Sequence, residues 1–163
     1  MRPPWIVFLI TAAALASTSV GTSGAAAPRS VVDCDEQVGT AQQPYREAGI
    51  VLDRIGLPRG RYPWPLARGA DRRYPWWGKW GALVRSGTNE PVTISIARPW
   101  RRHARIGWGN AGGLSVTFPP CSSSAPWIAY AGGFELKKRG CVPFDVQVGE
   151  QIQRIRIAFG RRC

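Results

Sequence analysis

Apolar and polar residues alternate along much of the chain after residue 80, which is the pattern of β-strands with one buried face. Three hairpins are predicted from this alternation and from the glycine, proline and asparagine residues between the runs. The paired strands are 82–85 with 92–96, 104–108 with 114–118, and 144–148 with 154–159. A further strand is predicted over 127–136, with a bulge or a bend at Gly132 and Gly133.

The third hairpin also carries finer predictions. Gly149 and Glu150 suit a two-residue turn, and Ile152 falls out of phase with Ile155, which predicts a bulge between them, near Gln153. Residues 42–55 are predicted as a short helix, interrupted by glycine. Because turn signals recur about every 8–12 residues, the chain is predicted to be all-β, a single antiparallel β-sandwich that is Ig-like or barrel-like.

The first residues have the pattern of a secretory signal peptide. Arg2 supplies one positive charge, an apolar run begins at Trp5, and small residues precede the expected cleavage point. We therefore predict that residues 1–26 are removed and that the mature protein is secreted or associated with the cell wall, with no stable membrane span. The alternative is an uncleaved segment that anchors the protein in a membrane.

The mature chain is predicted to form one monomeric domain with three parts. They are an N-terminal strand, linker and short helix over 27–60, an Arg/Trp/Tyr/Pro-rich segment over 61–80, and the core of the β-sandwich over 81–163.

Four cysteines in an exported chain predict two disulfides, because disulfides persist outside the cytosol. Their spacing contains no Cys-x-x-Cys pair, so no metal site is expected. A single histidine excludes chemistry that needs two imidazoles. Three pairings of four cysteines are possible. We predict Cys34 with Cys163 and Cys121 with Cys141.

The charge of the chain indicates a class of partner. There are 22 Lys and Arg against 10 Asp and Glu, which gives a net charge of +12 at pH 7. Most of the basic residues are arginines, whose planar guanidinium pairs bidentately with phosphate or carboxylate. This composition favours an anionic partner, although charge alone supports only non-specific association.

Residues 61–80 add aromatic rings to this charge and contain Arg-Tyr-Pro-Trp twice. Flat rings stack on bases or on the apolar faces of sugars, while the arginines pair with anions. The candidate binding residues are Arg61, Tyr62, Trp64, Arg72, Arg73, Tyr74, Trp76, Trp77, Lys79 and Trp80. In a second interpretation, these tryptophans cover one end of the sandwich and arginine stems pack over them.

A second basic and aromatic cluster over 98–105 extends the same surface in this hypothesis. Within it, His103 is flanked by arginines, so we expect it to be mostly neutral at pH 7. An enzyme would have to use two carboxylates, and nothing in the sequence selects a pair. No nucleophile elbow, zinc-protease or phosphate-loop motif is present either. We predict no catalytic residue and no cofactor.

Three stretches of the C-terminal half resemble a known group of proteins. They are Ile106-Gly107-Trp108-Gly109-Asn110, Tyr130-Ala131-Gly132-Gly133-Phe134 and Cys141-Val142-Pro143-Phe144. The resemblance is to small secreted four-cysteine, β-rich proteins of high-GC Gram-positive bacteria, which have no assigned activity. It covers roughly residues 80–163 and the start at Val32-Asp33-Cys34. It implies export and a framework that includes all four cysteines, and it transfers no catalytic or binding residue.

The sequence thus predicts a secreted, non-catalytic protein that binds an anionic cell-envelope or extracellular polymer, such as a wall polymer or glycan, through an Arg/aromatic surface. Nucleic acid is not the expected partner. Two alternatives remain open: a protein-interaction module with a Trp/Arg patch, and a small envelope glycan hydrolase that uses paired carboxylates.

Overall fold

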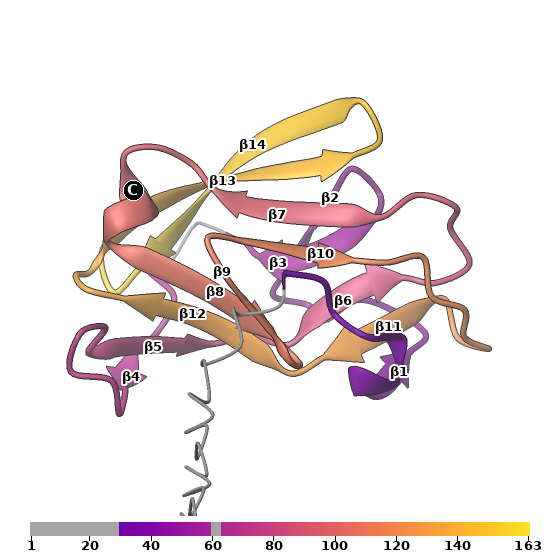
Figure 1. The fold of residues 1–163 in the computed structure, drawn as a ribbon, viewed down its shortest axis with the longest axis horizontal. Helices are drawn as coiled ribbons and strands as arrows, with labels where there is room; N and C mark the ends of the chain where they lie inside the picture. Colours follow the sequence, from indigo (N-terminus) through magenta and orange to yellow (C-terminus); the bar gives the residue numbers. More distant parts are fainter. Residues whose placement is uncertain (1–29, 60–62) are drawn as a thin grey trace, which may run out of the picture.

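The computed structural model describes residues 30–59 and 63–163, and most of them lie in β-strands (Figure 1). Every pair of named strands is antiparallel, and the strands form three sheets. Within the described residues the helical segments are two short 3-10 helices, η1 (Cys34–Glu36) and η2 (Trp100–Arg102). The all-β, antiparallel fold predicted from the sequence is therefore confirmed.

Each sheet is named here by a feature of its strands. The N-terminal sheet has the order β1 (Gln37–Ala41), β11 (Trp127–Tyr130), β6 (Ala82–Arg85), β3 (Ile55–Pro58), β2 (Ala48–Val51). The hairpin sheet has the order β10 (Ser115–Phe118), β7 (Val92–Ile96), β13 (Gly140–Val148), β14 (Gln151–Phe159). The glycine sheet has the order β4 (Ala67–Arg68), β5 (Trp76–Lys79), β12 (Gly132–Leu136), β8 (Ala104–Trp108), β9 (Ala111–Gly113).

The N-terminal and glycine sheets are continuous through a bent pair of strands. β5 leads into β6 and β11 into β12, and the backbone N–H of Trp80 donates to the Gly132 carbonyl (2.9 Å) at the bend. A Cβ on Gly132 would collide with the Gly107 carbonyl, and Gly133 has a φ of 156°, where side chains are rarely tolerated. Of the bulge or bend predicted at these two glycines, the structure has the bend, and it divides the single strand predicted over 127–136 into β11 and β12.

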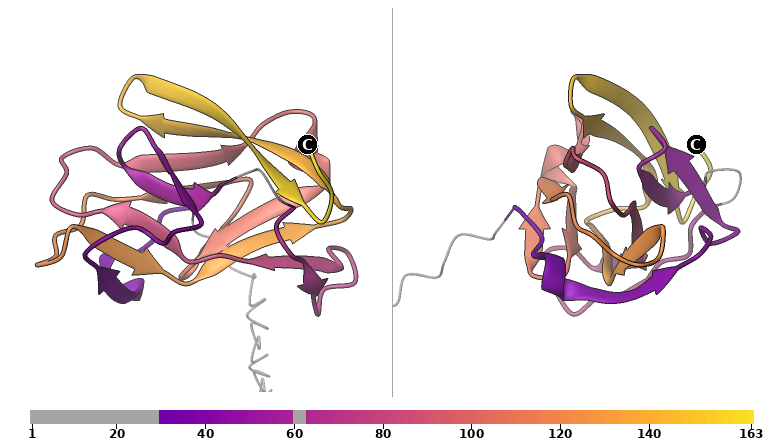
Figure 2. Two further views of the ribbon diagram at one scale, coloured as in Figure 1. Left: turned by 180° about the vertical axis from the view of Figure 1, so that it is seen from behind. Right: turned by 90° about the vertical axis from the view of Figure 1, so that its right-hand side faces the viewer.

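The hairpin and glycine sheets meet at two edges, so the strands surround a common interior (Figure 2, right). At one edge the N–H of Trp64 donates to the Ala158 carbonyl (2.6 Å), and the N–H of Gly160 donates to the Trp64 carbonyl (3.0 Å). At the other edge only Leu114 separates β9 from β10. These two contacts give the sandwich its barrel-like form.

Aromatic side chains fill the centre of this interior. Phe134 lies 5.4 Å from Trp108, 5.3 Å from Phe144 and 4.8 Å from Phe159, measured between ring centroids. All four rings are essentially inaccessible to solvent. The indole N–H of Trp108 donates to the Trp80 carbonyl (2.9 Å), so this buried donor is satisfied. Inward residues of all three sheets thus share one core.

Two of the three predicted hairpins have the wrong partners. β6 pairs with β11 and β3 in the N-terminal sheet, whereas β7 pairs with β10 and β13 in the hairpin sheet. β8 pairs with β9 across Gly109 and Asn110 instead of with β10. Alternation indicates which face of a strand is buried but does not identify the strand with which it pairs. Strands that follow each other in the sequence often pair, but here β6 and β7 lie in different sheets, as do β9 and β10.

The third predicted hairpin is confirmed, with Val148 opposite Gln151 across Gly149 and Glu150. The bulge near Gln153 is wrong, because the register of β13 and β14 is continuous. Ile152 lies opposite Gln147 and is 63% exposed, so its mismatch in phase reflects an outward position.

The predicted helix over 42–55 is also wrong, because part of this segment forms the hairpin of β2 and β3. A Cβ on Gly56 would contact the Ala48 and Leu83 side chains at 3.3 Å, so this strand lies close to its neighbours. Tertiary packing of this kind is not visible in the local apolar pattern.

The four cysteines form two disulfides, as predicted, but the predicted pairing is wrong. Cys34 is bonded to Cys121, and Cys141 to Cys163, so Cys34–Cys163 and Cys121–Cys141 do not occur. The antiparallel pairing of β13 with β14 returns the C-terminal end of the chain to the start of β13, beside Cys141. Spacing in the sequence does not reveal this strand pairing.

Candidate functional site

Two of the predicted binding residues are buried, Trp80 in the core and Tyr74 beneath the side chains of Arg105 and Lys137. Trp80 is 5% exposed, and its indole N–H donates to the Gly56 carbonyl (3.0 Å). Tyr74 is 7% exposed, and the Arg105 guanidinium lies 4.2 Å from its ring centroid. Neither ring offers a free face to a large ligand, so we place both residues in the scaffold.

Trp64 and Trp76 are half-buried and held by neighbours. The indole N–H of Trp64 donates to the Lys79 carbonyl (3.1 Å), and its ring meets Trp80 edge-on at 4.7 Å. The guanidinium carbons of Arg68 and Arg139 lie 4.4 Å and 4.1 Å from the Trp76 ring centroid. These contacts match the arrangement of the second interpretation, in which arginines pack over tryptophans that cover the sandwich.

The remaining predicted residues are spread over the surface. Arg72 and Arg73 lie in the exposed turn before β5, where the Arg73 N–H is bound by the Asp71 carboxylate (2.7 Å). Lys79 is exposed on β5, and Trp77 is half-buried on the same strand. Arg61 and Tyr62 lie outside the described residues. Among the described residues of this segment, 63–80, the structure does not gather the aromatic side chains into one exposed patch.

Positive charge gathers instead where the connection between β7 and β8 meets the turn between β12 and β13. We call residues 98–102 and 137–139, together with Arg154 and Arg156, the basic face. The N–H of Lys137 donates to the His103 carbonyl (2.8 Å), and that of Ala97 to the Pro143 carbonyl (3.0 Å), which holds these segments together.

An arginine-lined hollow of about 310 Å³ lies on the basic face. Its lining comes from Arg98, Pro99, Trp100, Cys141, Pro143, Arg154, Arg156 and Cys163. The Lys138 ammonium lies 5.3 Å from the Trp100 ring centroid, so the ring is flanked by charge. The Cys141–Cys163 disulfide joins two of the chain segments that line the hollow.

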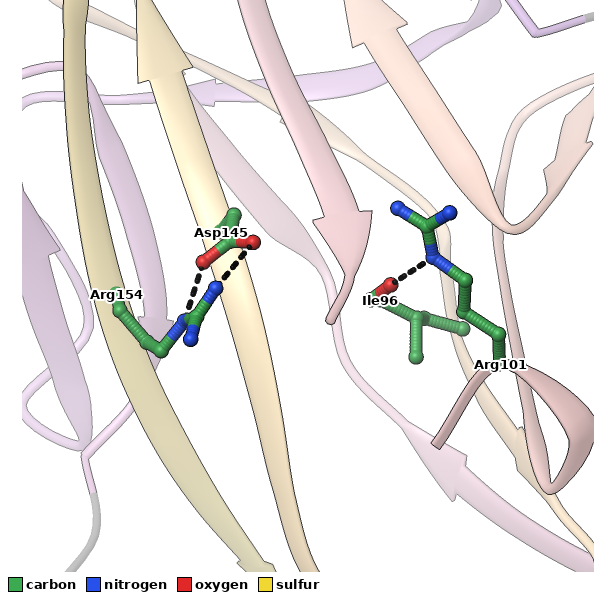
Figure 3. A network of polar contacts seen from close by, with 4 residues as sticks. All are labelled: Ile96, Arg101, Asp145 and Arg154. Carbon is green, nitrogen blue, oxygen red and sulfur yellow. Dashed lines mark hydrogen bonds and ion pairs between the residues drawn. The ribbon is translucent and has the colours of Figure 1, made fainter. Parts of the chain in front are cut away.

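Two arginines of the basic face have polar partners, which Figure 3 shows. Arg154 binds the Asp145 carboxylate through two hydrogen bonds (2.7 and 2.9 Å), and this contact lowers the pKa of Asp145. The Nε–H of Arg101 donates to the Ile96 carbonyl (3.0 Å). The side chains of Arg98 and Arg156 have no hydrogen bond or ion pair with another described residue.

His103 borders the basic face, with its ring 6.0 Å from that of Trp100. Its pKa is lowered by desolvation and by the charges of Lys138, Lys137 and Arg102. The neutral imidazole expected from the sequence is consistent with this direction. The positive charges that lower this pKa lie on the turn at 137–138 as well as on Arg102, which precedes His103 in the chain.

One pair of carboxylates converges on a single cation. Asp71 and Glu135 each place an oxygen 3.9 Å from the same Arg105 nitrogen. In a paired-carboxylate hydrolase, the two carboxyl groups flank the scissile bond. Here they flank a guanidinium, so this arrangement is that of an ion-pair network.

Sequence reasoning missed Arg154 and Arg156 as members of the candidate site. Their alternation with Ile155 and Ile157 predicts a strand, which is confirmed. The outward positions of that strand carry the arginines, and only the fold brings them beside residues 98–102. The available signal was the basic character of this outward face, next to the basic turn at 137–139.

Within residues 30–59 and 63–163 there is no group of three or more His, Cys, Asp or Glu side chains placed to hold a metal ion. No helix in the same residues is long and apolar enough to cross a membrane. A scan of protein-family models, a search of curated proteins and a search of solved structures each find no match to this chain. The geometry of the basic face therefore carries the functional argument.

Proposed function

We propose that this protein is an exported, non-catalytic module that binds an anionic polymer of the cell envelope or the extracellular space through its basic face. The observation that carries the proposal is the arginine-lined hollow. Arg98 and Arg156 border it without an acidic partner among the described residues, beside the ring of Trp100. A polymer that places phosphate or carboxylate groups at intervals would pair with these guanidiniums.

Guanidinium groups suit this ligand for two reasons. Each can form two parallel hydrogen bonds to a phosphate or carboxylate, which are stronger than bonds between neutral groups. Several exposed cations also attract a polyanion together. Salt weakens this attraction, because at physiological ionic strength charges separated by more than about 8 Å are largely screened from each other. Binding should therefore be tight at low salt and weak at high salt.

Export is part of the proposal and is supported by two observations. The two disulfides are typical of an oxidising compartment outside the cytosol. Residues 1–26 have the pattern of a signal peptide. Removal of this segment takes away one charged side chain, that of Arg2, so the chain stays strongly basic.

The test compares two variants with the same net charge. Arg98→Glu with Arg156→Glu reverses charge in the hollow, whereas Arg46→Glu with Arg59→Glu reverses it at exposed positions outside the basic face. Co-sedimentation with purified wall material and binding to polyphosphate are measured across a salt series. We expect the first variant to lose at least about tenfold in affinity at low salt, which corresponds to about 1.4 kcal/mol, and the second to lose much less.

Equal losses in the two variants would show that net charge alone drives the association and would refute a localised site. Saturation at a fixed ratio with one protein from the wall preparation, with no binding to the polymer, would favour the protein-interaction alternative. Circular dichroism and thermal unfolding confirm that each variant is folded before its binding is compared.

A further inference from the structure

A second hollow lies on the outer face of the glycine sheet and shares no lining residue with the arginine-lined hollow. We call it the glycine groove; its volume is about 570 Å³, within the range of roughly 300–1,000 Å³ that is usual for small-molecule sites. Trp77, Arg105 and Glu135 supply its large side chains, and glycines with Ala131 supply most of the rest of its lining.

Strand register explains why the floor of the groove is flat. Phe134, Ile106 and Trp108 point inward and are buried, so the residues between them point outward. Along β8 and β9 the outward positions include Gly107 and Gly112, which lie opposite each other. With no side chains there, a ligand can approach the backbone of the sheet directly.

One ring stands beside this floor. Register places Trp77 across β12 from Arg105, with Glu135 between them. Trp77 also lines a small apolar hollow formed with Trp64, Pro65 and Leu66. In the part of the chain that the structure describes, its indole has no hydrogen bond, ring contact or cation contact, unlike Trp64, Trp76 and Trp80.

Charge in the groove is compensated, in contrast to the basic face. Arg105 is shared between Glu135 and Asp71, each at 3.9 Å, and these three side chains are between 37% and 42% exposed. A phosphate or a nucleic acid in the groove would meet the Glu135 carboxylate and an arginine that is already paired, so an anionic ligand is disfavoured. The guanidinium and the carboxylate keep hydrogen-bonding positions that can serve hydroxyl groups.

We propose that the glycine groove is a binding subsite for a neutral sugar, with one pyranose ring lying over the glycine floor against Trp77. The apolar face of a pyranose stacks on an indole, and its hydroxyls exchange hydrogen bonds with Arg105 and Glu135. A peptide strand is a poorer fit, because β8 and β12 are already paired on both sides. This inference uses different residues from the basic face and holds whether or not that face binds a polymer.

The experiment titrates the ¹⁵N-labelled full-length protein with two neutral tetrasaccharides, those of glucose and of N-acetylglucosamine. Binding of at least one of them at millimolar concentration is expected, with a shift of the Trp77 indole N–H signal and no shift of the Trp76 signal. The affinity should be the same at low and at high salt, because the tetrasaccharide carries no charge that salt could screen. Substitution Trp77→Phe assigns the signal and retains part of the stacking.

Two variants locate the site. Trp77→Ala should weaken binding at least about tenfold. Ala131→Leu, which adds volume from an exposed position in the lining of the groove, should weaken it similarly while Trp77 stays in place. Absence of binding for both tetrasaccharides, or affinity that survives both substitutions in folded protein, would overturn the proposal. Loss of polyphosphate binding in the Arg98→Glu, Arg156→Glu variant leaves this result unaffected, so the two proposals can fail separately.

Discussion

The basic face and the glycine groove each contain a tryptophan and at least one arginine, but they differ in how the arginines are paired. Around Trp100, arginines border a hollow in which Arg98 and Arg156 have no acidic partner among the described residues. Around Trp77, Arg105 is shared by two carboxylates and the floor has no side chains. Composition alone would assign both regions to one cationic surface, whereas pairing makes one suited to anions and the other to neutral ligands.

The comparison also separates tryptophans that are adjacent in the sequence. Trp76, Trp77 and Trp80 lie within five residues of one another, yet one is covered by two arginines, one borders a groove and one is buried. Because side chains of a strand alternate between faces, neighbouring residues serve different purposes.

The largest contrast is between Trp80 and Trp77. Trp80→Ala is expected to lower the free energy of unfolding by about 3–5 kcal/mol, because it leaves a cavity and an unpaired Gly56 carbonyl. Trp77→Ala is expected to lower it by only about 1 kcal/mol, because this ring is half-exposed and makes no hydrogen bond among the described residues. Denaturation by guanidinium chloride measures both; equal losses would contradict the division of the segment.

The two disulfides should differ in both stability and binding. Their sequence separations are 87 and 22 residues, so in the chain-entropy model the Cys34→Ser, Cys121→Ser variant loses about 4.5 kcal/mol and the Cys141→Ser, Cys163→Ser variant about 3.5 kcal/mol. Only the second pair lines the arginine-lined hollow. Polyphosphate affinity should therefore fall in the less destabilised variant, and a fall in both folded variants alike would argue against this hollow.

Arg139 tests whether a cation of the basic face also has a structural role. Its guanidinium lies 4.1 Å from the Trp76 ring centroid, so Arg139→Ala should cost about 0.5–1 kcal/mol of stability, as is usual for exposed cation–π pairs. Arg139→Lys should recover part of this loss because it keeps the charge. Unchanged thermal unfolding in the alanine variant would show that the contact is not stabilising.

His103 should give the smallest effect, visible as a dependence on pH. Its pKa in the folded protein lies below the ordinary 6.5, because of desolvation and the charges of Lys138, Lys137 and Arg102. The unfolded chain therefore binds the proton more readily, so the stabilising contribution is complete above pH 6.5 and is lost as the pH falls through the folded value. His103→Asn should flatten this part of the stability profile; an unchanged profile would rule out His103 as its source.

The all-β class, the C-terminal hairpin and the bend at Gly132 could be predicted because each depends on local alternation or on glycine. Strand partners could not, since β6 and β7 are neighbours in sequence but belong to different sheets. The prediction of the disulfide pairing was wrong for the same reason, because the pairing depends on which strands are neighbours. At the candidate site, the basic cluster at 98–105 is recognisable in the sequence, but the position of residues 98–102 beside Arg154 and Arg156 depends on the register of the folded sheet.

The central claim is that the molecule has two electrostatically distinct binding regions, and one titration tests it most directly. A single ¹⁵N-labelled sample receives polyphosphate and then a neutral tetrasaccharide, at low and at high salt. The account predicts that polyphosphate shifts the Trp100 indole N–H signal only at low salt, and that the sugar shifts the Trp77 signal at both. Both ligands shifting the same indole signal, or salt abolishing both responses, would contradict it.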